Sequence, residues 1–287
     1  MPVRRPAREP VAAKVPAITA VFWLVKLLTT GMGEAASDYL GARSLVLAGL
    51  IGVLGLAAAL RWQLRTTRYT AVAYWSAVAM VAVFGTMAAD ALHVIGGIPY
   101  AFSTLFYAVV LTVVLALWRR REGTLSIHSI TSRSREAWYW VTVFVTFALG
   151  TAAGDLTAAQ LGWGYLPSAV LFAALIAVPA LLWWRTQVSP VATFWAAYVL
   201  TRPLGASIAD WAGKPASRSG VGLGDGPVTL VMVAAIAALV AYLAVSRSDI
   251  QPPTDPQSAG PVSHPVDRRV AAGSASSGSA ASGSASG

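Results

Sequence analysis

The chain has 287 residues, of which 56% are hydrophobic and only 11% are charged. Soluble domains carry about 25% charged residues, so this composition is that of a membrane protein and excludes an ordinary soluble domain. The net charge of +9 does not indicate nucleic-acid binding, because the basic residues lie in short tails and loops between apolar runs. The absence of cysteine excludes disulfides, thiolate metal sites and cysteine nucleophiles.

Eight apolar windows are long enough to cross a bilayer, since about 20 helical residues span its hydrocarbon core. We expect spans near residues 16–40, 44–60, 70–92, 99–118, 137–158, 165–184, 190–212 and 227–245. An even number of spans puts both termini on one side. The basic residues next to that side are Arg4, Arg5, Arg8, Lys14, Arg61, Arg65, Arg68, Arg119, Arg120, Arg121, Arg133, Arg135, Arg185 and Arg247. The other side holds only Arg43, Lys214 and Arg218, so both termini are predicted to be cytoplasmic.

The two ends of the chain differ in composition from the spans. Residues 1–14 form a basic, proline-rich tail, and residues 250–287 consist largely of Pro, Ser, Gly and Ala. Such a composition cannot bury a core, so the second tail is predicted to be disordered.

A fourfold repeat underlies the spans between these tails. An aromatic–tryptophan pair opens each odd-numbered span; the tryptophans are Trp23, Trp75, Trp140 and Trp195. A glycine follows each tryptophan by ten residues, at Gly33, Gly85, Gly150 and Gly205. An aspartate follows it by fifteen residues, at Asp38, Asp90, Asp155 and Asp210. We therefore divide the chain into repeats at residues 15–68, 69–136, 137–187 and 188–249.

Each repeat contains two spans, so every copy enters the membrane from the same side. The predicted fold is all-α, with eight transmembrane helices arranged as four parallel two-helix repeats around a pseudo-fourfold axis. A small residue stands four positions after each motif glycine, a spacing that lets helix backbones approach closely in a membrane. Other tryptophans at span ends are assigned to the interfacial aromatic belt, namely Trp62, Trp118, Trp183, Trp184 and Trp211.

The stretches KVPAITAVFWLVKLLTTGMGEAASD and FWAAYVLTRPLGASIAD are similar to the first and last repeats of a known family. That family consists of bacterial membrane-anchored proteins with four tandem two-span repeats, of the type called domain of unknown function 347. The resemblance extends over about residues 14–247 and implies a multi-pass protein of the bacterial inner membrane. It implies no established activity.

The four aspartates are expected at one common depth, because fifteen helical residues rise about 22 Å. Two interpretations remain open. In the first, each carboxylate accepts hydrogen bonds from neighbouring helices and serves packing. In the second, the four form a ring of acids at the mouth of a pathway, which would attract and select cations.

Three further charges, Lys26, Glu34 and Arg202, break the symmetry of the repeats. An unpaired ion at this depth is costly, so we expect Glu34 to pair with a basic residue. Arg202 is the better partner, since Lys26 lies about 12 Å along the same helix. The pair either fixes how repeat one docks on repeat four or forms part of a site. Thr86 and Thr151 occupy the position of Glu34 in the middle repeats, where they could serve as hydroxyl donors or as packing residues.

Two weaker motifs are interpreted structurally or left open. His93 follows Asp90 by three residues and could relay protons, although a histidine at a span end is more often interfacial. The sequence GLGDG around Asp225 matches part of an intramembrane aspartyl protease motif, but its partner motif is missing, so a turn is expected. No phosphate-binding loop, metalloprotease motif or serine-nucleophile elbow is present.

The sequence thus predicts a transporter or permease for a small cation, either a metal ion or a proton-coupled ligand. Its ligand-binding residues would be Glu34, Asp38, Asp90, Asp155 and Asp210, with Lys26 and Arg202 balancing their charge. The alternative is a membrane scaffold or sensor whose charges are structural. We expect no enzyme and no cofactor; the expected partners are the lipid bilayer and a small cation, not nucleic acid. The sequence leaves open any metal and the oligomeric state.

Overall fold

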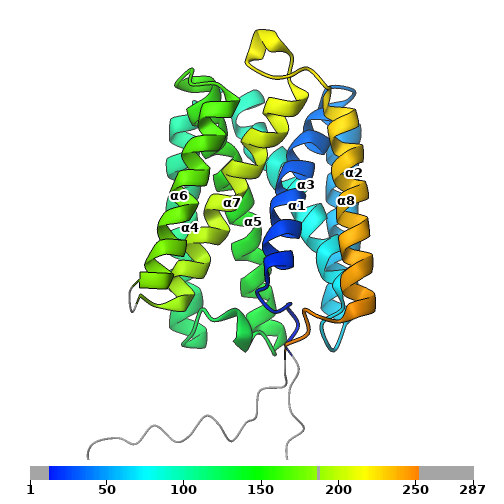
Figure 1. Ribbon diagram of the computed structural model, residues 1–287, viewed down its shortest axis with the longest axis vertical. Helices are drawn as coiled ribbons and strands as arrows, with labels where there is room; N and C mark the ends of the chain where they lie inside the picture. The colour runs from blue at the N-terminus through cyan, green and yellow to red at the C-terminus, as the bar shows by residue number, and fades with distance from the viewer. Residues whose placement is uncertain (1–12, 186–187, 252–287) are drawn as a thin grey trace, which may run out of the picture. The chain divides into compact units, whose positions relative to one another are not determined.

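A computed structural model describes residues 13–185 and 188–251 (Figure 1). These residues form no strand and eight α-helices: α1 (Ala20–Gly41), α2 (Leu45–Arg65), α3 (Ala71–Val94), α4 (Tyr100–Glu122), α5 (Arg133–Asp155), α6 (Tyr165–Arg185), α7 (Pro190–Gly213) and α8 (Asp225–Ser246). Most of the two predicted tails lies outside the described residues, as do Arg4, Arg5 and Arg8.

Six of these helices are long and apolar enough to cross a membrane: α2, α3, α4, α5 with its extension to Gln160, α6 and α8. Eight spans were expected. The two helices outside this set, α1 and α7, carry the charged residues of the first and last repeats, and these charges lower their hydropathy. Both nevertheless lie inside the bundle, where α1 packs against α3, α7 and α8.

The odd-numbered helices pack in a closed cycle, in which α1 contacts α3, α3 contacts α5, α5 contacts α7, and α7 contacts α1. In each contact, the motif glycine of one repeat lies against a residue of the following repeat in the cycle. That residue stands seven positions after the motif tryptophan of the following repeat. The four pairs are Gly33 with Ala82, Gly85 with Phe147, Gly150 with Arg202, and Gly205 with Thr30. A Cβ added at Gly33 would lie 2.5 Å from that of Ala82, a separation that real Cβ atoms do not adopt. The close approach of these helices therefore requires glycine, as the small-residue spacing suggests.

The even-numbered helices form the outside of the bundle (Figure 1). Helix α2 packs mainly against α3, α4 against α5, α6 against α7, and α8 against α1. Each even-numbered helix thus packs more closely against the odd-numbered helix of the following repeat than against the odd-numbered helix of its own repeat. Helix α2 can approach α3 closely because Gly52 and Gly55 of α2 leave room for the side chains of Met87 and Met80 from α3.

Both described ends of the chain lie at one end of the bundle, which we call the terminal end. The N–H of Ala17 donates to the carbonyl of Asp249 at 2.7 Å. Near this end each motif tryptophan packs on the aromatic residue of the preceding repeat. The centroid distances are 5.6 Å for Trp75 and Phe22, 5.6 Å for Trp140 and Tyr74, 6.2 Å for Trp195 and Tyr139, and 5.8 Å for Trp23 and Phe194. These eight rings form one aromatic layer across the cycle of odd-numbered helices.

A buried polar cluster joins three segments at the terminal end. Lys14 Nζ lies 2.6 Å from Glu136 Oε2, and Gln63 Nε2 donates to Glu136 Oε1 at 3.1 Å. Lys14 was assigned to the basic tail, but its side chain is buried here. Trp118 is also fully buried and packs edge-on against Trp195, so its assignment to the interfacial belt is wrong.

Candidate functional site

A cavity of about 890 Å³ lies at the end of the bundle opposite the terminal end, and it is not enclosed. It is surrounded by the C-terminal parts of the odd-numbered helices and the loops that follow them. Its wall includes five carboxylates, those of Glu34, Asp38, Asp90, Asp155 and Asp210. The wall also includes two basic residues, Lys214 and Arg218. All five residues predicted to bind a ligand therefore surround a single cavity.

Two of these carboxylates, on Asp90 and Asp155, are half-buried. Within residues 13–185 and 188–251, neither carboxylate forms an ion pair or a side-chain hydrogen bond. The hydrogen bonds to neighbouring helices that a packing role predicts are not seen for this pair. Asp155 ends α5, which continues as the π-helical turn η2 (Leu156–Gln160), a feature that often marks functional sites.

Below the cavity lies Arg202, which is completely buried and pairs with Glu34 of the wall but does not itself line the cavity. Its Nη2 lies 2.8 Å from Glu34 Oε2, donates to Thr151 Oγ1 at 2.7 Å, and also contacts the Thr86 hydroxyl. Its Nη1 donates to the carbonyl of Thr30 at 2.7 Å. One guanidinium thus bonds α1, α3 and α5 while belonging to α7. The ion pair expected between Glu34 and Arg202 is present.

Lys26 lies closer to the terminal end and is also buried, with 1% of its surface exposed. Its ammonium nitrogen stands 4.0 Å from the ring centre of Phe147 and 4.2 Å from that of Tyr198. Among the described residues it has no hydrogen-bond partner. Its contacts are therefore cation–π contacts, and it does not pair with Glu34.

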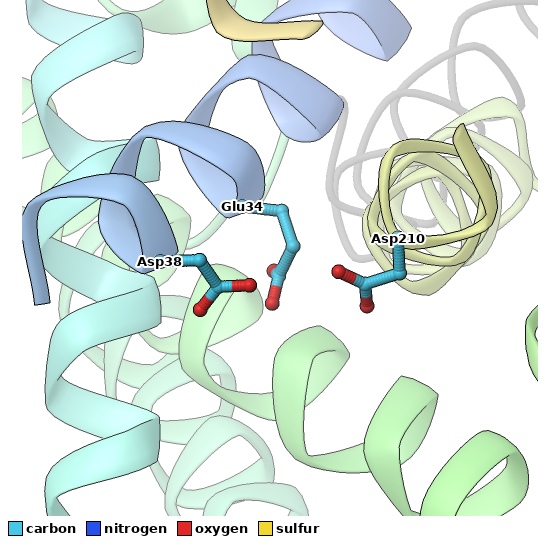
Figure 2. A group of neighbouring side chains, drawn as sticks. All are labelled: Glu34, Asp38 and Asp210. Atoms are coloured by element: carbon cyan, nitrogen blue, oxygen red, sulfur yellow. The ribbon is translucent and has the colours of Figure 1, made fainter. Parts of the chain in front are cut away.

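Three carboxylates of the cavity form a compact group, which we call the acid triad: Glu34, Asp38 and Asp210. Carboxylate oxygens of the three lie within 4.8 Å of one another. Figure 2 shows Glu34 and Asp38 projecting from α1 toward Asp210 of α7. Glu34 and Asp38 share one helix face because they are four residues apart.

Lys214, directly after α7, carries the ammonium group nearest to the acid triad. It contacts the Asp38 carboxylate, lies 3.1 Å from Asp225 Oδ2, and is 3.9 Å from Asp210 Oδ1. Burial lowers the pKa of Lys214, but these carboxylates outweigh burial and hold its pKa above the ordinary value. Lys214 therefore remains an ammonium ion throughout the physiological pH range.

The turn expected around GLGDG is present, since Gly222 and Gly224 have φ angles of 89° and 86°. Asp225 then begins α8 and pairs with Lys214, a role that sequence reasoning missed. His93 lies in the last turn of α3, where Nδ1 is 2.9 Å from the carbonyl oxygen of Ile98 and the ring stacks on Tyr100. It does not line the cavity.

These features define a multi-pass helical protein of membrane type, built from internal repeats. The chain belongs to the family described as Repeat of Unknown Function (DUF347), which matches residues 73–124, 138–189 and 193–249. The match covers three tandem repeats and leaves α1 and α2 outside it. No curated protein and no solved structure matches the chain.

Proposed function

We propose that this protein is a transporter or permease for a small cation, which enters the membrane through the acid-lined cavity. The observation that carries the proposal is the state of Asp90 and Asp155. Among the described residues, these two carboxylates line an open cavity without a basic partner or a hydrogen-bond donor, and such carboxylates attract cations. Intramembrane acids are costly, and such residues typically mark ion or substrate pathways.

The proposal includes eight spans, with α1 and α7 crossing the membrane inside the bundle. Their least favourable charges, Glu34 and Arg202, are bonded to each other and buried, so lipid does not meet them. It also includes a fourth repeat at residues 15–68 and a pseudo-fourfold axis. Both are supported by the four equivalent glycine contacts and the four equivalent tryptophan contacts, because each set closes from repeat four onto repeat one.

We place the terminal end in the cytoplasm and the protein in the bacterial inner membrane. Arg65 is the last residue of α2 and Arg185 the last of α6, and the last turn of α4 contains Arg119, Arg120 and Arg121. The Tyr69 N–H, just before α3, donates to the carbonyl of Ala13, which puts the end of α2 at the terminal end. This distribution agrees with the positive-inside rule. The acid-lined cavity then faces the periplasm.

Transport requires the floor of the cavity to open, because Arg202 and the aromatic layer stand between the cavity and the terminal end. Pro203 follows Arg202 inside α7 and lacks a backbone N–H, so α7 is weakened at this level. We propose that α1 and α7 separate here, which would release Arg202 from Glu34. Lys26, which lies closer to the terminal end than Arg202, would then be the next positive charge along the opened path.

A scaffold or sensor without transport is the second candidate. It is favoured by the contacts of Arg202, which join four helices and would stabilise any bundle of this design. The two functions differ in what Asp90 and Asp155 do. In a scaffold their removal has no functional effect, whereas in a transporter it impairs flux.

The test is a flux assay in proteoliposomes with metal ions, protons and organic cations as separate substrates. We expect uptake of at least one class by the wild type and a loss of about tenfold or more in Asp155→Asn. Asp249→Asn is the matched control, because it makes the same chemical change at the terminal end, outside the cavity. Absence of flux for every class, in protein shown to be folded, would refute transport.

A further inference from the structure

We propose that the acid triad of Glu34, Asp38 and Asp210 is a binding site for a small divalent metal ion, and that Lys214 competes with this ion as a tethered cation. The inference rests on the proposed function and goes further, because it selects three of the five carboxylates, names the class of ligand and identifies its competitor.

The arrangement of oxygens fits one ion. The three carboxylates offer oxygens within 4.8 Å of one another, from two neighbouring turns of α1 and from α7. Mg²⁺ and Ca²⁺ bind oxygen at roughly 2.0 to 2.6 Å, so opposite ligands on one ion lie roughly 4 to 5 Å apart. A set of carboxylates without nitrogen or sulfur ligands favours Mg²⁺, Ca²⁺ or Mn²⁺ over softer metals.

Asp210 gives a second, separate indication of a ligand. Its side chain is 6% exposed, and Figure 2 shows its carboxylate directed at Glu34. Within the described part of the chain, Oδ1 has no hydrogen-bond partner. The nearest ammonium, on Lys214, is 3.9 Å away and thus beyond hydrogen-bond distance. A buried carboxylate oxygen without a donor is costly, and a metal ion would remove this cost.

The charges favour a divalent ion. Arg202 neutralises one of the three carboxylates through Glu34, which leaves two negative charges for a ligand. Lys214 reduces these two charges to one as long as its ammonium contacts Asp38.

Lys214 also has an alternative position. Its ammonium is 3.1 Å from Asp225, which is not part of the acid triad. When an ion binds, we expect Lys214 to leave Asp38 and to keep its bond with Asp225. The chain thus carries a positive charge that occupies the site in the absence of an ion.

The experiment measures Mn²⁺ binding to full-length protein in detergent, by the loss of the electron paramagnetic resonance signal of free Mn²⁺. Lys214→Met should tighten binding by about tenfold or more, because the competing charge is gone, whereas Asp210→Asn should weaken it by about 10- to 100-fold. Arg218→Met is the matched control, since it removes a positive charge from the cavity wall without touching the triad. Thermal unfolding establishes that each variant is folded.

Each outcome decides one point. If Arg218→Met tightens Mn²⁺ binding as much as Lys214→Met, competition by Lys214 is refuted. If Asp210→Asn binds Mn²⁺ like the wild type, the triad is not the site, and this holds even if Lys214→Met does not fold. If neither the wild type nor any variant binds Mn²⁺ while the wild type still transports protons or organic cations, the divalent site is refuted and transport stands. Absence of both binding and flux would refute this inference and the proposed function together.

Discussion

The guanidinium of Arg202 lies 2.8 Å from the carboxylate of Glu34, and this ion pair joins the last odd-numbered helix to the first. Both partners are buried, so neither charge can be removed without leaving the other uncompensated. A test of the ion pair must therefore compare the removal of one charge with the removal of both. Breaking a buried ion pair on one side costs more than replacing both partners by neutral groups.

We therefore expect Glu34→Gln to lower the free energy of unfolding by about 3–5 kcal/mol, and Glu34→Gln with Arg202→Gln to lower it by less. The measurement is thermal or denaturant unfolding in one detergent. If the double variant lost as much stability as Glu34→Gln alone, or if the losses caused by the two substitutions added up, the two charges would not interact.

Gly150 has no room for a side chain. A Cβ at this position would lie 2.3 Å from Arg202 Cγ, so Gly150→Leu should separate α5 from α7 and destabilise or prevent folding. Gly49→Leu is the matched control, because no atom lies within 4 Å of a Cβ at that position of α2. A Gly150→Leu protein that unfolds at the wild-type temperature would contradict the packing described here.

Lys26 buries an ammonium that has no carboxylate partner in the part of the chain that the structure describes, so its replacement by an apolar residue of similar length should stabilise the fold. We expect Lys26→Met to raise the free energy of unfolding by about 1–4 kcal/mol and to impair flux. Arg185→Met removes an exposed cation–π contact with Trp184 and should change stability by less than about 1 kcal/mol. A destabilised Lys26→Met protein would show that the ammonium makes a favourable interaction in the fold.

Asp249 gives a pH-dependent prediction at the terminal end. Burial raises the pKa of Asp249 above 3.8, although the hydrogen bond from the Tyr69 hydroxyl opposes this shift. A group with a raised folded-state pKa contributes stability below its unfolded pKa and loses it as the pH rises. Asp249→Asn avoids that loss and keeps an acceptor for Tyr69. The unfolding temperature of the variant should exceed that of the wild type at pH 7.5, and the difference should disappear near pH 3.5. A difference independent of pH would exclude Asp249 as its cause.

Much of this architecture could be predicted from the constant spacing between the motif tryptophan, glycine and aspartate of each repeat. Offsets of ten and fifteen residues from each tryptophan correspond to fixed positions on a helix, so they predicted the parallel helices and the residues at their contacts. The expectation that Arg202 pairs with Glu34 followed from the cost of buried charge and from their levels in equivalent helices. Both arguments depend only on the positions of residues along regular helices, and these positions can be read from the sequence.

Lys214 and Asp225 could not be recognised in the same way. They lie in the irregular connection around the end of α7, where no periodicity shows which side chains turn inward. Their partner Asp38 is 176 residues away from Lys214 and is brought close only when the cycle of helices closes. The burial of Trp118 likewise depends on α4 packing against α5 and near Trp195, not on its position at a helix end.

The central claim is that carboxylates surround a water-accessible cavity that selects cations. The chain contains no cysteine, so a single cysteine introduced as Ala88→Cys, in the wall of the cavity, can be labelled without background. The measurement compares its rates of modification by cationic and anionic thiosulfonate reagents of similar size. We predict that the cationic reagent reacts at least about tenfold faster, because an acid-lined cleft concentrates positive ions. Equal rates, faster modification by the anionic reagent, or no reaction with either one would contradict the claim.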